Sequence, residues 1–213
     1  MAYTRGSNAN IIVGAAALFT YEAGELADGD MPAYAAATSY KDTLQDDAGF
    51  RNVGYTMNGL ELAFQPDFGE VQVDQLLDVA KLYKQGMQVN MNTAFAESTL
   101  ENLLFAIAAP DSDLSSLTGT GIGTNSQELL LNSGELGECP VERGLVAVGP
   151  GTGDCAPTEQ MERIYVAYRA LSIENVTVAA RRDEATMFEV SFRLLPNDSG
   201  AYGKVVDRAI PAS

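Results

Sequence analysis

The sequence predicts a mainly β protein: an antiparallel β-sandwich with one flanking α-helix and long loops. Three observations support this class. Segments of alternating polar and apolar residues recur along the chain, turn signals separate them at intervals of about 10 residues, and only one segment has helical periodicity. The 213 residues are enough for one sizeable core, so we expect a single domain over residues 1–213.

The chain begins with an apolar run and then a long polar segment. Ile11–Phe19 is predicted to be a buried strand. The segment at about 22–50 contains glycine and proline and has no sustained period, so we expect a long loop there. Residues 22–78 contain twelve acidic side chains and only two basic ones, which concentrates negative charge in this part of the chain.

Asn58-Gly59 predicts a hairpin between two short strands at 53–57 and 60–64. A type I′ turn requires positive φ at both central residues, and this dipeptide adopts such angles readily. Val71 and Val73 then suggest a further short strand.

Alternation resumes at Met87–Phe95, where one face is apolar and the other polar. We expect the apolar face of this strand to lie in the core and the polar face to meet water or a polar neighbour.

The predicted helix follows this strand. Ser98-Thr99-Leu100-Glu101 has the pattern of a capping box, in which the Ser98 hydroxyl and the Glu101 carboxylate each accept a backbone N–H. Pro110 limits the helix. An apolar stripe at helical spacing should pack on a sheet, and its members are Leu100, Leu103, Leu104 and Ile107.

A second long loop is expected at about 111–140, where glycine, serine and threonine are frequent. Its Gly119–Gly123 segment lacks the Lys-Ser/Thr pair of a phosphate-binding loop, so we interpret it as a loop only. The last third returns to predicted strands, followed by a polar tail after Pro196. These strands are expected at 144–148, 162–171, 175–180 and 186–195.

Composition argues against catalysis. Histidine is absent, which removes the Ser-His-Asp and Cys-His nucleophile arrangements and the common zinc ligand sets. Acidic pairs such as Asp46-Asp47 are more typical of solvated turns than of acid–base sites. We therefore expect no enzyme activity, no cofactor and no bound metal.

Two cysteines, Cys139 and Cys155, lie among glycines and prolines with no metal-binding spacing. They either close one loop as a disulfide or remain unpaired thiols. The second interpretation is favoured because nothing else in the sequence indicates an oxidising compartment. No signal-like or membrane-spanning segment is evident, so we expect a protein made in the cytoplasm without a membrane partner.

The order of these segments resembles the major tail tube protein family of long-tailed, siphovirus-type bacteriophages and related tailed viruses. Three stretches carry the resemblance: the hairpin with Gly54, Tyr55, Asn58 and Gly59, the acidic segment 70–75 with Asp74, and the strand-to-helix step at 89–104. In the last stretch the matching residues are Glu97, Ser98, Leu100, Glu101 and Leu103. Residues 10–19 and 188–197 are similar to the family's first and last core strands.

The resemblance implies a structural virion protein that assembles into stacked, usually hexameric rings. The inner sheets of the subunits would join into one β-barrel around a channel for double-stranded DNA, which passes through without specific binding. Implied partners are copies of the chain itself and the tape-measure, tail terminator and tail-tip proteins. The implied location is the virion tail, assembled in the host cytoplasm.

Two alternatives stay open at this stage. A secreted or surface β-sandwich binding module would share the strand pattern, although the chain has no tryptophan with which to stack a sugar. The net charge of −16 also has two explanations. It would let DNA slide along a channel wall without sticking, or it would reflect adaptation to the high salt of a halophilic host.

Overall fold

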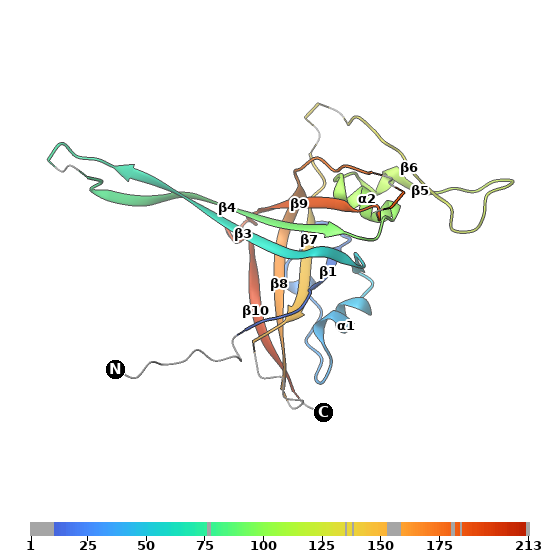
Figure 1. Ribbon diagram of the computed structural model, residues 1–213, viewed down its shortest axis with the longest axis horizontal. Coiled ribbons are helices and arrows are strands. Elements are labelled where there is room, and N and C mark those ends of the chain that lie inside the picture. Colours follow the sequence, from blue (N-terminus) through green and yellow to red (C-terminus); the bar gives the residue numbers. More distant parts are fainter. Residues whose placement is uncertain are drawn as a thin grey trace.

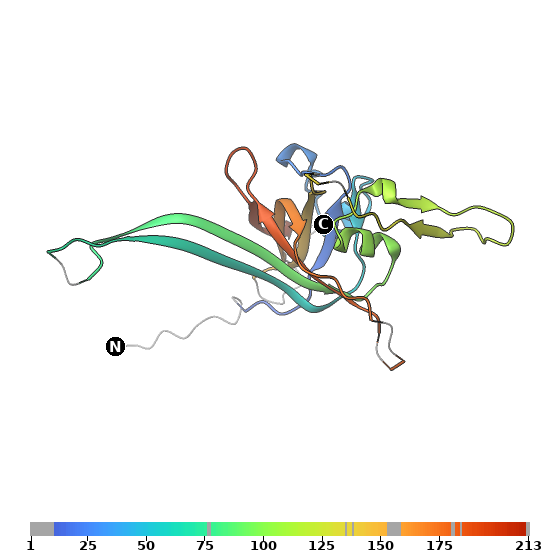
Figure 2. The ribbon, with the colours of Figure 1, turned by 90° about the horizontal axis from the view of Figure 1, so that it is seen from above.

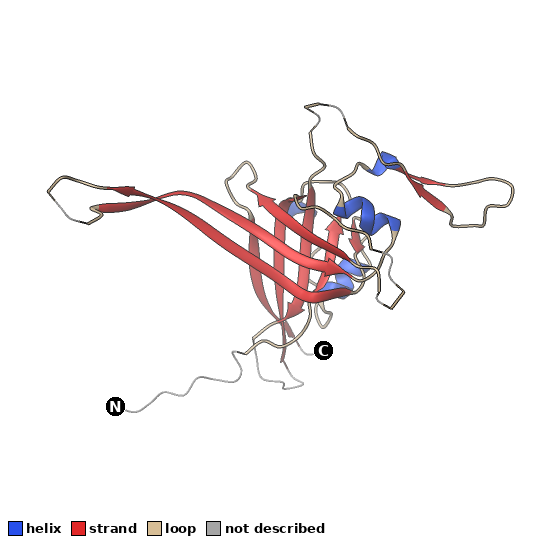
Figure 3. Ribbon diagram, turned by 45° about the horizontal axis from the view of Figure 1, so that its top comes forward, coloured by secondary structure: helices blue, strands red, loops and turns tan. Residues whose placement is uncertain are grey.

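The computed structural model describes residues 11–75, 78–134, 136–137, 139–152, 159–179, 182–183 and 185–211. It confirms a mainly β, antiparallel protein, and it contains two α-helices where the sequence predicted one (Figure 3). The helices are α1, Tyr40–Gln45, and α2, Leu100–Ala106. The strands are β1 Ala17–Tyr21, β2 Phe50–Asn52, β3 Thr56–Val71, β4 Lys81–Phe95, β5 Leu114–Ser116, β6 Gln127–Leu129, β7 Arg143–Pro150, β8 Glu159–Ser172, β9 Phe188–Leu195 and β10 Gly203–Pro211.

Strand β8 organises the main sheet because it pairs with three other strands. One edge pairs with β7, while the other pairs with β10 along 159–167 and with β9 along 169–172. The sheet order is β2-β1-β7-β8-β9-β4-β3, and β10 branches from β8. Figure 1 shows the consequence: β7, β8 and β10 run steeply across β3, β4 and β9.

The two parts of this sheet enclose a first core with α2. Buried side chains from β1, β7 and β8 meet those from β4 and β9 there. Helix α2 contributes Phe105, whose ring stacks on Phe192 of β9 with centroids 4.8 Å apart and on Phe95 of β4 at 6.0 Å. The predicted apolar face of Met87–Phe95 is therefore confirmed as a core face.

A second core lies on the opposite face of β1, β7 and β8. Leu26, Tyr40 and Leu44 cover it, and all three are almost completely buried. Residues 22–50 are thus not the structureless loop that the sequence predicted. They include a 3-10 turn at Asp28–Asp30 and helix α1, because their few apolar residues are spaced to reach this face.

The carboxylate of Glu162 holds this covering segment in place. It accepts hydrogen bonds from the Tyr40 backbone N–H at 3.0 Å and from the Ser39 hydroxyl at 2.9 Å, at the N-terminus of α1. Arg208 of β10 completes the site with a 2.7 Å ion pair to the same carboxylate. Glu162 is 4% exposed, so this charge is compensated by specific partners rather than by water.

The predicted Asn58-Gly59 hairpin is wrong. Both residues have positive φ, 64° and 72°, but they form a bulge inside the continuous strand β3. Asn58, Gly59 and Leu60 together oppose Thr93, whose hydroxyl donates to the Gly59 carbonyl at 2.9 Å. The dipeptide correctly predicted positive φ at both residues. The chain does not reverse there, however, but in the segment between β3 and β4.

Helix α2 begins one residue later than the capping box predicted. Its N-cap is Thr99, whose hydroxyl accepts the Asn102 N–H at 3.2 Å. Ser98 instead donates to the Thr186 carbonyl, and Glu101 accepts from Gln127. The stripe shifts accordingly: Leu104 is buried while Ile107 is exposed.

The strand predictions in the rest of the chain have mixed outcomes. Strands predicted near 144–148, 162–171 and 186–195 are confirmed as β7, β8 and β9. The predicted strand at 175–180 is wrong over its described residues, which have no regular structure, and Val73 lies beyond the end of β3. Ile11–Ala16 is not strand either, since β1 begins at Ala17.

Two segments that the sequence predicted to be a loop and a polar tail contain strands. Residues 111–140 include a 3-10 turn at Asp111–Asp113 and the β5–β6 hairpin. The polar tail after Pro196 includes β10, whose alternating Lys204, Val206 and Arg208 combine charge with a partly buried position. The three charged residues Lys204, Asp207 and Arg208 concealed this strand.

Two neighbouring ion pairs on β8 and β10 give a test of this fold. Glu162 is paired with Arg208, and Arg163 with Asp207, in consecutive registers on opposite faces. Glu162→Gln should lower the free energy of unfolding by about 3 kcal/mol, because it leaves Arg208 buried without its counter-charge. Asp207→Asn should cost less than about 1 kcal/mol because the second pair is exposed. Urea unfolding measures both.

The lowered pKa of Asp207 also predicts how the stability loss of Asp207→Asn depends on pH. Hydrogen bonding to Arg163 lowers the pKa of Asp207, so its stabilising contribution is present near neutral pH and is lost as the pH falls through that lowered pKa. The difference between the wild-type protein and the variant should therefore shrink in acid. Equal losses for Glu162→Gln and Asp207→Asn at neutral pH would contradict the assignment of Glu162 as the anchoring group.

Candidate interaction site

The long hairpin of β3 and β4 leaves the body of the protein. Strand β9 pairs with β4 only from Val89 to Phe95, so the outer part of the hairpin is a two-stranded ribbon. We call residues 66–71 and 81–88 the ribbon. Figures 1 and 2 show it extending from one end of the molecule in both views.

The ribbon exposes apolar side chains that it cannot cover itself. On one face Phe68 and Leu82 are 54% and 59% exposed. On the other face the Tyr83 ring lies across Gly69, where an added Cβ would come within 2.6 Å of it. An isolated two-stranded ribbon is marginally stable in water, so this arm is suited to a partner.

Charge is divided between the two strands of the hairpin. Strand β3 carries only acidic charges, Glu61, Asp67 and Glu70, whereas β4 carries only the basic Lys81 and Lys84. The outer edge of β4 beyond Val89 pairs with no described strand. The outer edge of β3 has no partner among the described strands either, so the ribbon has two open edges, an acidic one on β3 and a basic one on β4.

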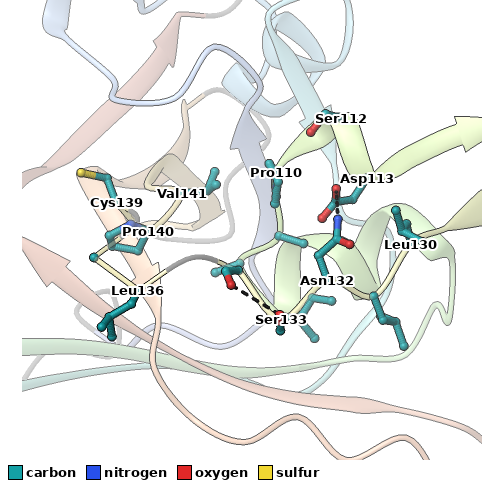
Figure 4. Close-up of a pocket in the computed structure, with 16 residues that line it drawn as sticks. Pro110, Ser112, Asp113, Leu130, Asn132, Ser133, Leu136, Cys139, Pro140 and Val141 are labelled. Carbon is teal, nitrogen blue, oxygen red and sulfur yellow. Dashed lines mark hydrogen bonds between the residues drawn. The ribbon is translucent and has the colours of Figure 1, made fainter.

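A second arm, the β5–β6 hairpin, projects from the opposite end of the molecule (Figure 2). A groove of about 910 Å³ lies at its base, between the end of α2 and the segment that leads to β7. Figure 4 shows the labelled side chains Leu130, Leu136 and Cys139 around it, together with the 2.9 Å hydrogen bond from Asn132 to Asp113. Leu131 at its rim is 75% exposed. We call this hollow and its rim the arm groove.

The sequence around the arm groove has no basic residue. All eight charged residues between 85 and 142 are acidic: Glu97, Glu101, Asp111, Asp113, Glu128, Glu135, Glu138 and Glu142. Arg143, immediately after this stretch, is buried and forms an ion pair with Asp111. Among the described residues that line the arm groove, Asp113 is the charged one, and it lies beside exposed leucines.

Elsewhere most basic side chains are already paired within the body. Arg51, Arg143, Arg163, Arg169, Lys204 and Arg208 each form an ion pair. Lys204 and Tyr168 both hydrogen-bond the Asp28 carboxylate and lower its pKa. Lys81 and Lys84 of the ribbon form no ion pair within the part of the chain that the structure describes.

A smaller apolar groove, of about 370 Å³, lies at the base of the ribbon. Leu62, Met87 and Leu194 line one side, and residues 200–205 line the other. The Tyr202 hydroxyl crosses it and donates to the Met87 carbonyl at 2.5 Å. The groove borders β10, whose outer edge has no partner among the described strands.

Three of the sequence-predicted residues lie together. The Glu97 carboxylate accepts the Tyr55 backbone N–H at 2.9 Å and occupies the space that a side chain on Gly54 would need. Gly54 also has a φ of 87°, which favours glycine. Tyr55 itself is 80% exposed.

Asn102 connects this cluster to α2, and sequence reasoning did not single it out as a key residue. Its side-chain amide donates to the Val53 carbonyl at 2.8 Å and to the Glu97 carbonyl at 2.9 Å, and its oxygen accepts from Arg51 at 2.8 Å. Asn102 lies on the side of the helix opposite the predicted apolar stripe, so the sequence pattern gave no signal for its burial.

The remaining predicted residues are dispersed. Asn58 and Gly59 form the bulge, and Asp74 is exposed in the segment that joins β3 to β4. Ser98 and Glu101 hydrogen-bond outside α2, Leu100 is half-buried, and Leu103 packs on the first core. Cys139 is exposed, whereas Cys155 lies outside the described residues, so a bond between them stays untested.

No protein-family model matches this sequence, and no curated protein matches it. Among the described residues, no group of His, Cys, Asp or Glu side chains is arranged to hold a metal ion. None of the helices in the described part of the chain has the length and apolar character needed to cross a bilayer. The uncovered ribbon and the arm groove are therefore the features that call for a functional explanation.

The role of Asn102 in holding the Gly54–Glu97 cluster can be measured directly. Asn102→Ala should lower the free energy of unfolding by about 2–3 kcal/mol, because it leaves two carbonyls without their donor in a buried position and removes one of the two acceptors of Arg51. Asn132→Ala removes an exposed amide with one hydrogen bond and should change stability by less than about 0.5 kcal/mol. A small loss for Asn102→Ala, similar to that of the control, would contradict this role.

Proposed function

We propose that this protein is a structural subunit that assembles with copies of itself into a tube, the tail tube of a tailed virus. The observation that carries the proposal is the ribbon, which extends exposed Phe68, Leu82 and Tyr83 beyond the body. Monomeric proteins rarely expose contiguous apolar surface of this kind. The order of sequence motifs that resembles the tail tube family specifies which kind of assembly we propose.

Open strand edges favour assembly through the sheet. The strands β2, β3 and β10 lie at the ends of the described sheet, and unpaired edges attract other strands. In the proposed assembly the two parts of the sheet act as a β-sandwich of tail-tube type. Ring closure would pair the edges of neighbouring subunits and complete an inter-subunit β-barrel.

The acidic composition supports a conduit for double-stranded DNA. A net charge of −16 repels phosphates and provides no counterion-release term for binding, so DNA would pass without being held. The role we propose is structural and not catalytic, and the location is the virion tail. Tape-measure, tail terminator and tail-tip proteins would be the further partners.

Electron microscopy tests the proposal. Purified protein at high concentration should form rings or tubes visible by negative staining, if necessary with an initiating tail-tip complex, because the ribbon and the open edges favour self-association. Phe68→Ser/Leu82→Ser should abolish them while leaving the circular dichroism spectrum of the body unchanged. A wild-type protein that stays monomeric under all these conditions and fits no tail density in intact virions would refute the proposal.

Assembly at different salt concentrations separates the two explanations of the acidity. If the charge reflects a halophilic host, rings and tubes should require molar salt, which screens the repulsion between acidic subunits. The matched comparison is the same preparation dialysed to low salt and back. Tubes that persist unchanged at low salt would remove the support for halophilic adaptation and leave the channel-wall explanation.

A further inference from the structure

We propose that the ribbon of one copy docks onto the arm groove of the next copy. This inference rests on the proposed self-assembly and specifies one of its contacts. It starts from the ribbon, whose apolar side chains lie on both faces of only two strands. Covering both faces requires a partner that contacts the ribbon along its length.

The arm groove is the surface whose shape and composition fit this partner. Its leucines at 130, 131 and 136 are exposed beside a hollow of about 910 Å³. A large aromatic side chain such as Phe68 or Tyr83 would fill part of this hollow and bury apolar area on both sides. Burial of this apolar area would stabilise the contact and offset part of the cost of association.

Charge selects the partner and the strand. The ribbon has two open edges. That of β3 carries Asp67 and Glu70, whereas that of β4 carries Lys81 and Lys84. The arm groove lies within a stretch of 58 residues, 85–142, without a lysine or arginine. Asp113 lines the groove, so opposite charges favour a contact made through the β4 edge of the ribbon.

The placement of the two surfaces gives the contact a direction. The ribbon and the β5–β6 arm project from opposite ends of the molecule, as Figures 1 and 2 both show. One copy can therefore use its ribbon on a second copy while its own arm groove receives the ribbon of a third. Such a heterologous contact continues until it closes into a ring or extends as a filament.

Disulfide cross-linking tests this contact, because Cys139 already lies in the arm groove. The variant Leu82→Cys/Cys155→Ser has one thiol on the ribbon and one in the groove. Under mild oxidation it should give a ladder of dimers, trimers and larger species on a non-reducing gel. A disulfide needs Cα atoms within about 7 Å, so only close contact produces the ladder.

Two controls make the result specific. Leu82→Cys/Cys139→Ser/Cys155→Ser should lose the ladder, and a remaining dimer would show a ribbon–ribbon contact and overturn the proposal. Val178→Cys/Cys155→Ser places the thiol at an apolar residue with similar exposure outside both surfaces. An equal ladder from this variant would show random collision and overturn the proposal as well.

Microscopy of the same samples separates this inference from the proposed function. Rings or tubes without a ladder would overturn the docking contact and leave the tube proposal standing. A ladder without rings or tubes would support the contact and count against the tube. The absence of both would overturn both.

Discussion

The buried carboxylate of Glu162 is the contact on which the rest of the structure depends. It joins strand β8, the N-terminus of α1 and Arg208 of β10 in one compensated site. Without it, the segment that covers the second core would lose its attachment, and β10 would retain an unpaired buried cation. Strand β8 also pairs with strands of both parts of the sheet. Its pairing therefore sets the arrangement of the body from which the two arms project.

A rigid platform matters because the arms themselves have little internal support. The ribbon is held only by the register between β3 and β4, and the β5–β6 hairpin pairs over three positions. Many of their apolar side chains are exposed and form no core of their own. The proposed tube follows from this division between a self-sufficient body and two arms that need partners.

The sequence predicted the class and the central strands because period-2 alternation depends on burial of one face, as at Met87–Phe95. Prediction from the sequence failed where contacts between distant segments determine the secondary structure. Asn58-Gly59 has the backbone angles of a turn, but pairing with β4 continues past it. Lys204 and Arg208 of β10 made this segment look like a polar tail, because their partners Asp28 and Glu162 are far away in the chain. The exposed ribbon has no signature in a single sequence because the partners that we propose for it are other molecules.

The anchoring of α1 also determines when the body can form during synthesis. The Tyr40 N–H meets a carboxylate that lies 122 residues further along the chain, and Arg208 follows Glu162 by another 46. A nascent chain therefore exposes the second core until β8 and β10 have left the ribosome, since such non-local contacts form late. The ribbon and the arm groove are translated before that point, so the two surfaces that we propose to dock onto each other leave the ribosome before the body is complete.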